Sequence, residues 1–301
     1  MRQSAYFLLL FLFPIILYSQ EHSLFSLSDQ NLVYSNPAFT GTANNFRAGN
    51  SFRNILANIS GNQISNTVYA DQYFGKFGAG GIAYSHSNYI RYSINTLSLS
   101  YAYRIKIGDT SHLQFGLAPS FSANEASYSY FNNFFNNGSP PVVYKSFGEN
   151  FNFSGGVLFY NHLFFAGYAL HNINQPSVPS YLSHEHQYNL PLRHSVQFGL
   201  YGKVNDAIKI NLFGNCHFQK DFQSISQVIQ IKVKHLLAGF GYQTNNNFLS
   251  RFGIVYNHFR LVYGYDIIMS NLSILGSGSH EINLQVLLDF NKKSNPYAIN
   301  Y

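Results

Sequence analysis

Two short polar clusters contain residue types and spacings that could support chemistry. The run Ser279-His280-Glu281 offers a hydroxyl, an imidazole and a carboxylate, and a lipid-cleaving hydrolase needs such groups within hydrogen-bonding reach of one another. The run His184-Glu185-His186, with His194 beyond it, places two imidazoles at a spacing of two, which in an extended segment puts both on one face and allows weak metal chelation. Which chemistry is available depends on the elements that carry these residues.

The elements around the first cluster are strands, because apolar and polar residues alternate with a period of two. In residues 281–290 the even positions are apolar and the odd positions are mostly polar, and residues 96–107 and 208–218 alternate in the same way. On such a strand Ser279 and His280 point to opposite faces, with His280 on the apolar side and Glu281 on the polar side. The cluster therefore predicts a strand entry and no catalytic site.

The histidine cluster lies in a long polar connection, which is an ordinary place for exposed polar residues. The sequence lacks stronger metal motifs such as His-Glu-x-x-His on a helix. We prefer an exposed loop over a metal site, and we predict no metal and no cofactor.

The composition excludes most soluble classes. Asp, Glu, Lys and Arg make up 10% of the 301 residues, against about 25% in a typical soluble domain, whereas Phe and Tyr raise the aromatic share to 18%. The net charge is +6, and the Lys and Arg residues form no run, so nucleic-acid binding has little support. Cys216 is the only cysteine and excludes an intrachain disulfide.

The first 19 residues resemble a secretory signal peptide. Arg2 supplies a positive start, residues 7–17 are apolar, and Ser19 precedes a possible cleavage point. The alternative is an N-terminal membrane anchor, but the apolar run is shorter than the roughly 20 residues that span a bilayer. We expect Sec export and cleavage after residue 19.

Alternating segments recur along the rest of the chain, and many reach the roughly 9–11 residues of a tilted transmembrane strand. There are about fourteen of them, at residues 45–54, 65–74, 78–89, 92–107, 111–124, 150–161, 163–173, 193–204, 207–220, 222–234, 236–245, 247–257, 259–269 and 278–290.

The connections between these segments alternate in length. Five short ones, near residues 108–110, 161–162, 205–206, 234–235 and 257–258, follow even-numbered segments, whereas the long stretches 125–149 and 174–192 follow odd-numbered ones. Short periplasmic turns and longer extracellular loops are typical of outer-membrane barrels. An all-β, transmembrane antiparallel β-barrel of about 14 strands is therefore favoured over a soluble β-sandwich.

The barrel interpretation assigns a face to each residue. The apolar parity should contact lipid, and the polar parity, which includes Arg104, Lys106, Lys209 and Lys232, should face the lumen, since a basic residue at the bilayer midplane costs about 2–4 kcal/mol. Tyrosines near strand ends, such as Tyr160, Tyr201 and Tyr256, are expected in the aromatic girdles. The aromatic and Asn-rich stretch 130–144 would fold into the barrel mouth or face a partner.

The segment ahead of the first strand carries Asn36-Pro37-Ala38-Phe39-Thr40-Gly41, which is too rich in breakers for a regular helix or strand. Pro37 should hold Asn36 extended, and Gly41 should permit a turn into the sheet. We expect Phe39 to place its ring in the lower lumen. The predicted organisation is a signal peptide (1–19), an N-terminal periplasmic or plug segment (20–44), the barrel (45–290) and a C-terminal tail (291–301).

Four stretches together resemble the PorP/SprF family of outer-membrane proteins from the type IX secretion system of Bacteroidetes. They are LFSLSDQNLVYSNPAFTG at 24–41, FRN at 52–54, SYAYRIKI at 100–107 and GSGSHEINLQVLLDF at 276–290, in the family's order. The chain departs from the family where Ile55 and Leu56 replace the usual Gln-Trp after Arg53-Asn54, and the tail lacks the family's basic-then-aromatic ending. These departures put partner contacts made through those positions in doubt more than they do the fold.

The resemblance implies a non-enzymatic, fourteen-stranded barrel that supports secretion or surface anchoring of a cognate protein, including gliding-motility adhesins. Its implied partners are periplasmic components of the secretion system, the secreted surface protein and outer-membrane lipid, with no nucleic acid. A porin-like channel for small solutes is the alternative, since fourteen strands lie between filled and open barrels. The family-motif residues that could contact a partner or plug are Asn36, Pro37, Ala38, Phe39, Gly41, Arg53, Asn54, Ser279, His280 and Glu281.

Overall fold

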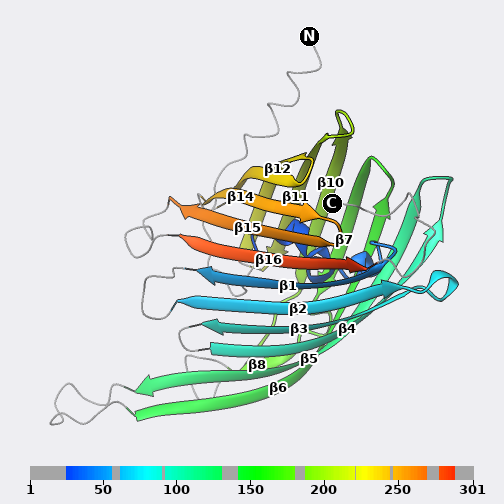
Figure 1. Ribbon diagram of the computed structural model, residues 1–301. Helices are drawn as coiled ribbons and strands as arrows, with labels where there is room; N and C mark the ends of the chain where they lie inside the picture. The colour runs from blue at the N-terminus through cyan, green and yellow to red at the C-terminus, as the bar shows by residue number, and fades with distance from the viewer. Residues whose placement is uncertain are drawn as a thin grey trace.

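The chain folds into a closed antiparallel β-barrel (Figure 1). The computed structural model describes residues 25–55, 62–89, 92–130, 142–179, 187–220, 222–244, 247–269 and 278–288. Fourteen strands form the ring, and the first pairs with the last, from Phe46 opposite Leu288 to Ile55 opposite Ser279. Closure pairs the backbone groups at both edges of the sheet. Strands surrounded by lipid require this, because no water is present to hydrogen-bond to them. The predicted transmembrane antiparallel β-barrel of about 14 strands is confirmed.

Apart from the extracellular ends of β5 and β6, the strand bounds lie within a few residues of the predicted segments. In ring order from the N-terminus they are β1 (Phe46–Ile55), β2 (Gln63–Tyr73), β3 (Ala79–Tyr89), β4 (Tyr92–Lys106), β5 (His112–Tyr130), β6 (Val142–Tyr160), β7 (Phe164–His171), β10 (Arg193–Lys203), β11 (Ile208–Gln219), β12 (Phe222–Val233), β13 (Leu236–Gln243), β14 (Asn247–Tyr256), β15 (Phe259–Ile268) and β16 (Ser279–Leu288).

Helical structure in the described ranges is limited to single turns. Three lie ahead of β1, namely η2 (Ser28–Gln30), α1 (Leu32–Ser35) and η3 (Pro37–Phe39), and η4 (Gly75–Phe77) connects β2 with β3. Among the residues that the structure describes, no helix has the length and apolar character to cross a membrane.

The two ends of the barrel differ as the loop lengths predicted. The connections after even-numbered strands of the ring are all short, such as Lys234-His235 and Asn257-His258, whereas those after odd-numbered strands vary from the short connection between β11 and β12 to the long one between β7 and β10. Asn257 turns the chain with a φ of 50°. The first strand begins and the last strand ends at this short-turn end, which corresponds to the periplasmic side of bacterial outer-membrane barrels.

Two expectations about the opposite, extracellular end were wrong. Residues 125–130 and 142–149 are strand and not loop, because β5 and β6 continue as a long hairpin that pairs as far as Tyr130 with Val142. The alternation persists there, with Phe147 71% and Phe151 66% exposed and Asn150 buried between them. The stretch 174–192 is also partly regular, since β8 (Ser177–Pro179) pairs with β9 (Gln187–Asn189). Of the predicted mouth segment at 130–144, residues 131–141 lie outside the described residues.

The two faces of the sheet are sorted as the alternation predicted. On β4, Leu97, Leu99, Tyr101, Tyr103 and Ile105 are each more than 40% exposed. Arg104, on the other parity, points inward and donates through Nε to Gln114 Oε1 at 3.1 Å. Lys106 and Lys209 also keep the polar parity but reach solvent at the periplasmic rim, and Lys232 lies there opposite Lys209 in the register.

The expected girdle position is wrong for two of the three named tyrosines. Tyr256 is 57% exposed, but Tyr160 is 1% exposed and stacks on His112 at a centroid distance of 5.2 Å. Tyr201 packs against the lumen ring of Phe165. The reason is parity: both side chains point inward, where an apolar cluster receives them.

The lipid face makes one prediction. Leu99, at the middle of β4, is 55% exposed on the outer face, so Leu99→Arg should lower the free energy of unfolding by about 2–4 kcal/mol. Ile107→Arg, on the same face at the periplasmic end, should cost only about 0–1 kcal/mol. Equilibrium unfolding in lipid vesicles measures both, and an equal cost for the two variants would contradict the assigned membrane position.

Candidate functional site: the N-terminal plug in the lumen

Residues 25–45, here called the plug, lie inside the barrel (Figure 1). Asn36, Ala38, Phe39 and Thr40 are each 0% exposed. The plug contacts inward-facing residues all around the ring, including residues of β1, β2, β4, β5, β7, β10, β12, β14, β15 and β16. The motif residues Asn36 to Gly41 therefore lie in the lumen.

Asn36 and Pro37 shape the first half of the motif. Pro37 begins η3, and Asn36 before it is extended, with φ −160° and ψ 117°, as predicted. The Asn36 side chain accepts a hydrogen bond from the Ala38 backbone N–H at 2.8 Å and donates to Gln197 Oε1 on β10 at 3.1 Å. One side chain thus caps the local turn and fixes it to the wall.

Gly116 of β5 makes room for this turn. A Cβ at Gly116 would lie 2.3 Å from the Ala38 backbone nitrogen and 2.4 Å from the Pro37 carbonyl carbon. Both are main-chain atoms, so no side-chain rotation could relieve the contact. The bare backbone of β5 is therefore the surface on which the motif rests.

Phe39 supplies the apolar part of the plug. Its ring meets Phe165 of β7 edge-on, with centroids 5.2 Å apart and an interplanar angle of 85°. Leu158 and Phe213, from β6 and β11, complete a buried cluster around it. Full burial of one such side chain is worth about 1.5–3 kcal/mol. Phe39 thus contributes to a small hydrophobic cluster within a lumen whose other inward-facing residues are mainly polar.

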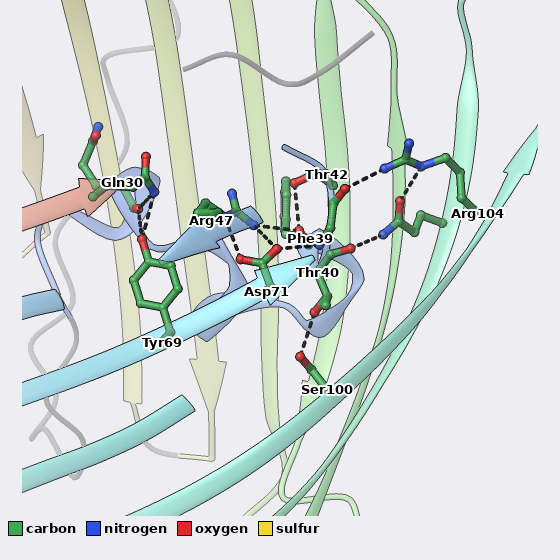
Figure 2. Close-up of polar contacts among 12 residues, drawn as sticks. Gln30, Phe39, Thr40, Thr42, Arg47, Tyr69, Asp71, Ser100 and Arg104 are labelled. Carbon is green, nitrogen blue, oxygen red and sulfur yellow. Dashed lines mark hydrogen bonds and ion pairs between the residues drawn. The ribbon is translucent and has the colours of Figure 1, made fainter. Parts of the chain in front are cut away.

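A buried ion pair fixes the second half of the motif (Figure 2). Asp71 on β2 accepts hydrogen bonds from Arg47 Nε at 2.8 Å and from the Gly41 backbone N–H at 2.6 Å. Arg47 also donates from Nη2 to the Phe39 carbonyl at 3.0 Å. Gly41 has a φ of +72°, as predicted for a turn, and a Cβ there would meet Ala79 Cβ at 2.3 Å. The pair joins β1, β2 and the plug in one network.

Polar contacts continue along the wall beside this pair. Thr40 donates from Oγ1 to Ser100 Oγ at 2.9 Å (Figure 2). The Thr40 carbonyl accepts from Gln114 Nε2 at 2.6 Å. Arg104 donates from Nη2 to the Gly41 carbonyl at 2.9 Å. Backbone groups that leave regular structure are thereby satisfied by wall side chains, as buried polar groups require.

A second buried ion pair holds the start of the plug. Asp29 contacts Arg251 of β14 and accepts from Gln230 Nε2 of β12 at 2.7 Å. Arg251 also donates from Nη2 to the Ser26 carbonyl at 2.5 Å. Both charges are compensated within the lumen. Removing one partner of such a pair typically costs about 3–5 kcal/mol, because the other charge stays buried.

The third cluster joins two of the predicted motif segments. Arg53 of β1 donates from Nη2 to Asp266 Oδ2 at 2.7 Å and from Nε to Ser279 Oγ at 3.0 Å. Glu281 lies 3.9 Å from Arg53 Nε and accepts from the Ser26 backbone N–H at 2.7 Å. Arg53, Ser279 and Glu281 are thus brought together, and they hold the plug's first described residues.

Two motif residues lie on the other face. Asn54 pairs with His280 in the register of β1 and β16, and its Oδ1 accepts from Asn62 Nδ2 at 3.0 Å. His280 Nδ1 contacts the Tyr263 hydroxyl at 2.8 Å on the outer surface. Because Ser279 and His280 point to opposite faces, the structure does not assemble a Ser-His-Glu site.

The histidine cluster that suggested metal binding cannot be placed, since residues 184–186 lie outside the described residues. His194 is described, and its Nδ1 contacts the Tyr168 hydroxyl at 2.8 Å. Within the described ranges no group of three or more His, Cys, Asp or Glu residues is arranged to hold a metal ion.

Sequence reasoning missed most of the charged residues that hold the plug, namely Asp29, Arg47, Asp71, Arg251 and Asp266. A usable signal existed for the strand residues. The chain has only 12 acidic residues, and those on the polar parity of a transmembrane strand face the lumen, where each needs a cationic partner. The sequence does not indicate which cationic residue pairs with which acidic residue.

The geometry defines a class: a transmembrane β-barrel whose lumen is filled by its own N-terminal segment. The chain matches the family described as type IX secretion system membrane protein PorP/SprF over residues 18–286. It belongs to this PorP/SprF family, as the sequence resemblance predicted. A search of curated proteins found no match.

Solved structures support the fold. The toluene transporter TbuX of Ralstonia pickettii has a TM-score of 0.52 and 8% identity, covering 85% of this chain and 93% of its own. A FadL homologue of Pseudomonas aeruginosa has a TM-score of 0.50 and 10% identity, covering 87% of this chain and 94% of its own. At these identities the likeness concerns the barrel alone.

The close approach at Gly116 makes a prediction. Gly116→Ala should lower the free energy of unfolding by about 1–3 kcal/mol, because the new methyl group displaces the plug backbone. Gly155→Ala is the matched control, since a Cβ there has only ordinary contacts, the nearest at 3.5 Å to Leu117. Denaturant unfolding of both variants in detergent measures the difference, and equal midpoints would show that the motif does not rest on β5.

Proposed function

We propose that this protein is a non-enzymatic outer-membrane component of the type IX secretion system that supports secretion or surface anchoring of a cognate surface protein, such as a gliding adhesin. The observation that carries the proposal is the burial of the family motif as a plug. A lumen crossed by buried ion pairs and a Phe39-centred core is suited to a docking platform and poorly suited to a solute pore.

Both ends of the barrel offer surfaces to partners. At the periplasmic rim, Lys76, Lys203, Lys209 and Lys234 are exposed, and Lys209 lies opposite Lys232 in the register. Asp206 pairs with Lys203 at 2.5 Å and offsets part of this charge. A basic rim favours approach of an acidic surface, which suits a periplasmic component of the secretion system.

The extracellular end suits the secreted partner. The β5–β6 hairpin exposes Phe147 and Phe151, and Lys145 pairs with Glu125 beside them at 2.5 Å. Aromatic side chains next to adaptable polar groups are common in protein interfaces. Export itself depends on residues 1–19, which we propose are a cleaved signal peptide.

The test is genetic. Deleting the gene should remove at least one type IX surface protein from the cell surface, and a plasmid copy of the wild-type gene should restore it. Quantitative proteomics of the cell surface and the culture medium measures both export and retention. A surface proteome unchanged by the deletion would overturn the proposed function. Sustained large conductance of the intact purified protein in planar bilayers would favour the porin alternative.

A further inference from the structure

A cavity of about 130 Å³ lies between the plug and the lumen face of the wall, on the extracellular side of α1. Val33, Tyr34 and Pro37 form its floor, and small residues of β3 to β6 form most of its wall. Since about 10–15 Å³ already holds one water molecule, the cavity has room for the end of a side chain or of a peptide.

The cavity wall is polar and rich in hydroxyl groups. Ser85, Thr96, Ser98, Ser120 and Ser154 line it, and each is on the inward parity of its strand. Hydroxyl groups can donate or accept hydrogen bonds, so this wall can adapt to an oxygen-rich ligand. No acidic residue is among the described residues that line the cavity.

Arg193 gives the cavity its charge. It is the first residue of β10, at the extracellular end, and it is only 7% exposed. Its Nε and Nη1 have no hydrogen-bond partner among the described residues. Burial raises the pKa of the neighbouring Tyr34, so that phenol stays neutral and does not compensate the guanidinium.

This arrangement contrasts with most of the other buried arginines. Three of the other four, Arg47, Arg53 and Arg251, each have a carboxylate within the lumen. The fourth, Arg260, donates from Nη1 to Gln30 Oε1 at 3.3 Å. Among the ion pairs of the described residues, none includes Arg193. A guanidinium stays protonated and presents planar N–H donors that match a carboxylate, and a buried charge without a counter-ion is costly. A carboxylate on a ligand would therefore provide the counter-ion for Arg193 in this cavity.

Amide groups extend the polar surface beyond Arg193. Asn152 lines the cavity, and its Oδ1 has no partner in the described part of the chain. Asn150, two residues closer to the extracellular end on the same face of β6, has neither amide atom paired. Such groups recognise peptide N–H and C=O groups, which a free small anion lacks.

We propose that this cavity binds a carboxylate carried by a peptide segment, either a chain terminus or an acidic side chain, that enters from the extracellular end. Arg193 binds the carboxylate, and Asn150 and Asn152 contact the adjoining main chain. That the segment belongs to the cognate secreted protein rests on the proposed function.

The test uses the purified full-length barrel in detergent and a tetraglutamate peptide, with binding measured by calorimetry. Arg193→Gln should weaken the peptide Kd about tenfold or more, as expected for loss of a charge-assisted hydrogen bond. Lys220→Gln, which removes an exposed cation from an extracellular turn, should leave the Kd unchanged. Tetraglutamine should not bind.

A second variant separates binding from folding. Ser98→Leu keeps Arg193 but fills the cavity, and it should also abolish binding while the barrel keeps its heat-modifiable mobility on gels. Absence of peptide binding by the wild type, or equal weakening in the Arg193 and Lys220 variants, would overturn the proposal. Competition by acetate as effective as that by the peptide would overturn its peptide part. If the peptide does not bind but deletion of the gene still removes a surface protein, the proposed carboxylate site is wrong and the proposed function is retained.

Discussion

A strand that crosses lipid finds no water for its backbone, so the first and last strands of this sheet must pair with each other. Closure gives every strand one face toward lipid and one toward the lumen, and the chain meets this with apolar and polar residues in alternation. The polar faces then meet in a narrow space, where uncompensated charge is costly. Arg47 with Asp71, and Arg251 with Asp29, are the local solutions to that constraint.

The plug follows from the same constraint, because it fills a space that the closed wall creates. Asn36 and Gly41 form its turns, Phe39 gives it a core, and the buried pairs connect it to distant strands. Because the plug contacts so many strands, it links the inner faces of strands that do not contact one another directly. The outer surface and the two rims lie outside this packing, and the proposed docking role rests on these surfaces.

The sequence predicts the barrel well because period-two alternation recurs in nearly every strand, and loop lengths then orient the ring. The prediction from sequence is wrong where the inward face becomes apolar and where the alternation is weak. Tyr160 and Tyr201 have the inward parity, but their apolar surroundings in the lumen come from Phe39, far away in sequence. The predicted β5 and β6 segments are too short because Asn and Gly residues obscure the alternation, which Phe147, Phe151 and Phe153 continue on the outer face. Asp29 and Arg251 are 222 residues apart, and no local pattern links them.

Proximity of the plug to the wall in native membranes is the most direct test of this architecture. Thr40→Cys with Ser100→Cys, in a Cys216→Ser background, replaces two hydroxyl groups whose oxygens are 2.9 Å apart. Oxidation of isolated outer membranes should link residues 40 and 100 in a disulfide detectable by mass spectrometry. Thr40→Cys with Leu99→Cys, whose second position faces lipid, should give no link. Absence of the first link, or equal yields from the two pairs, would contradict a plug seated in the lumen.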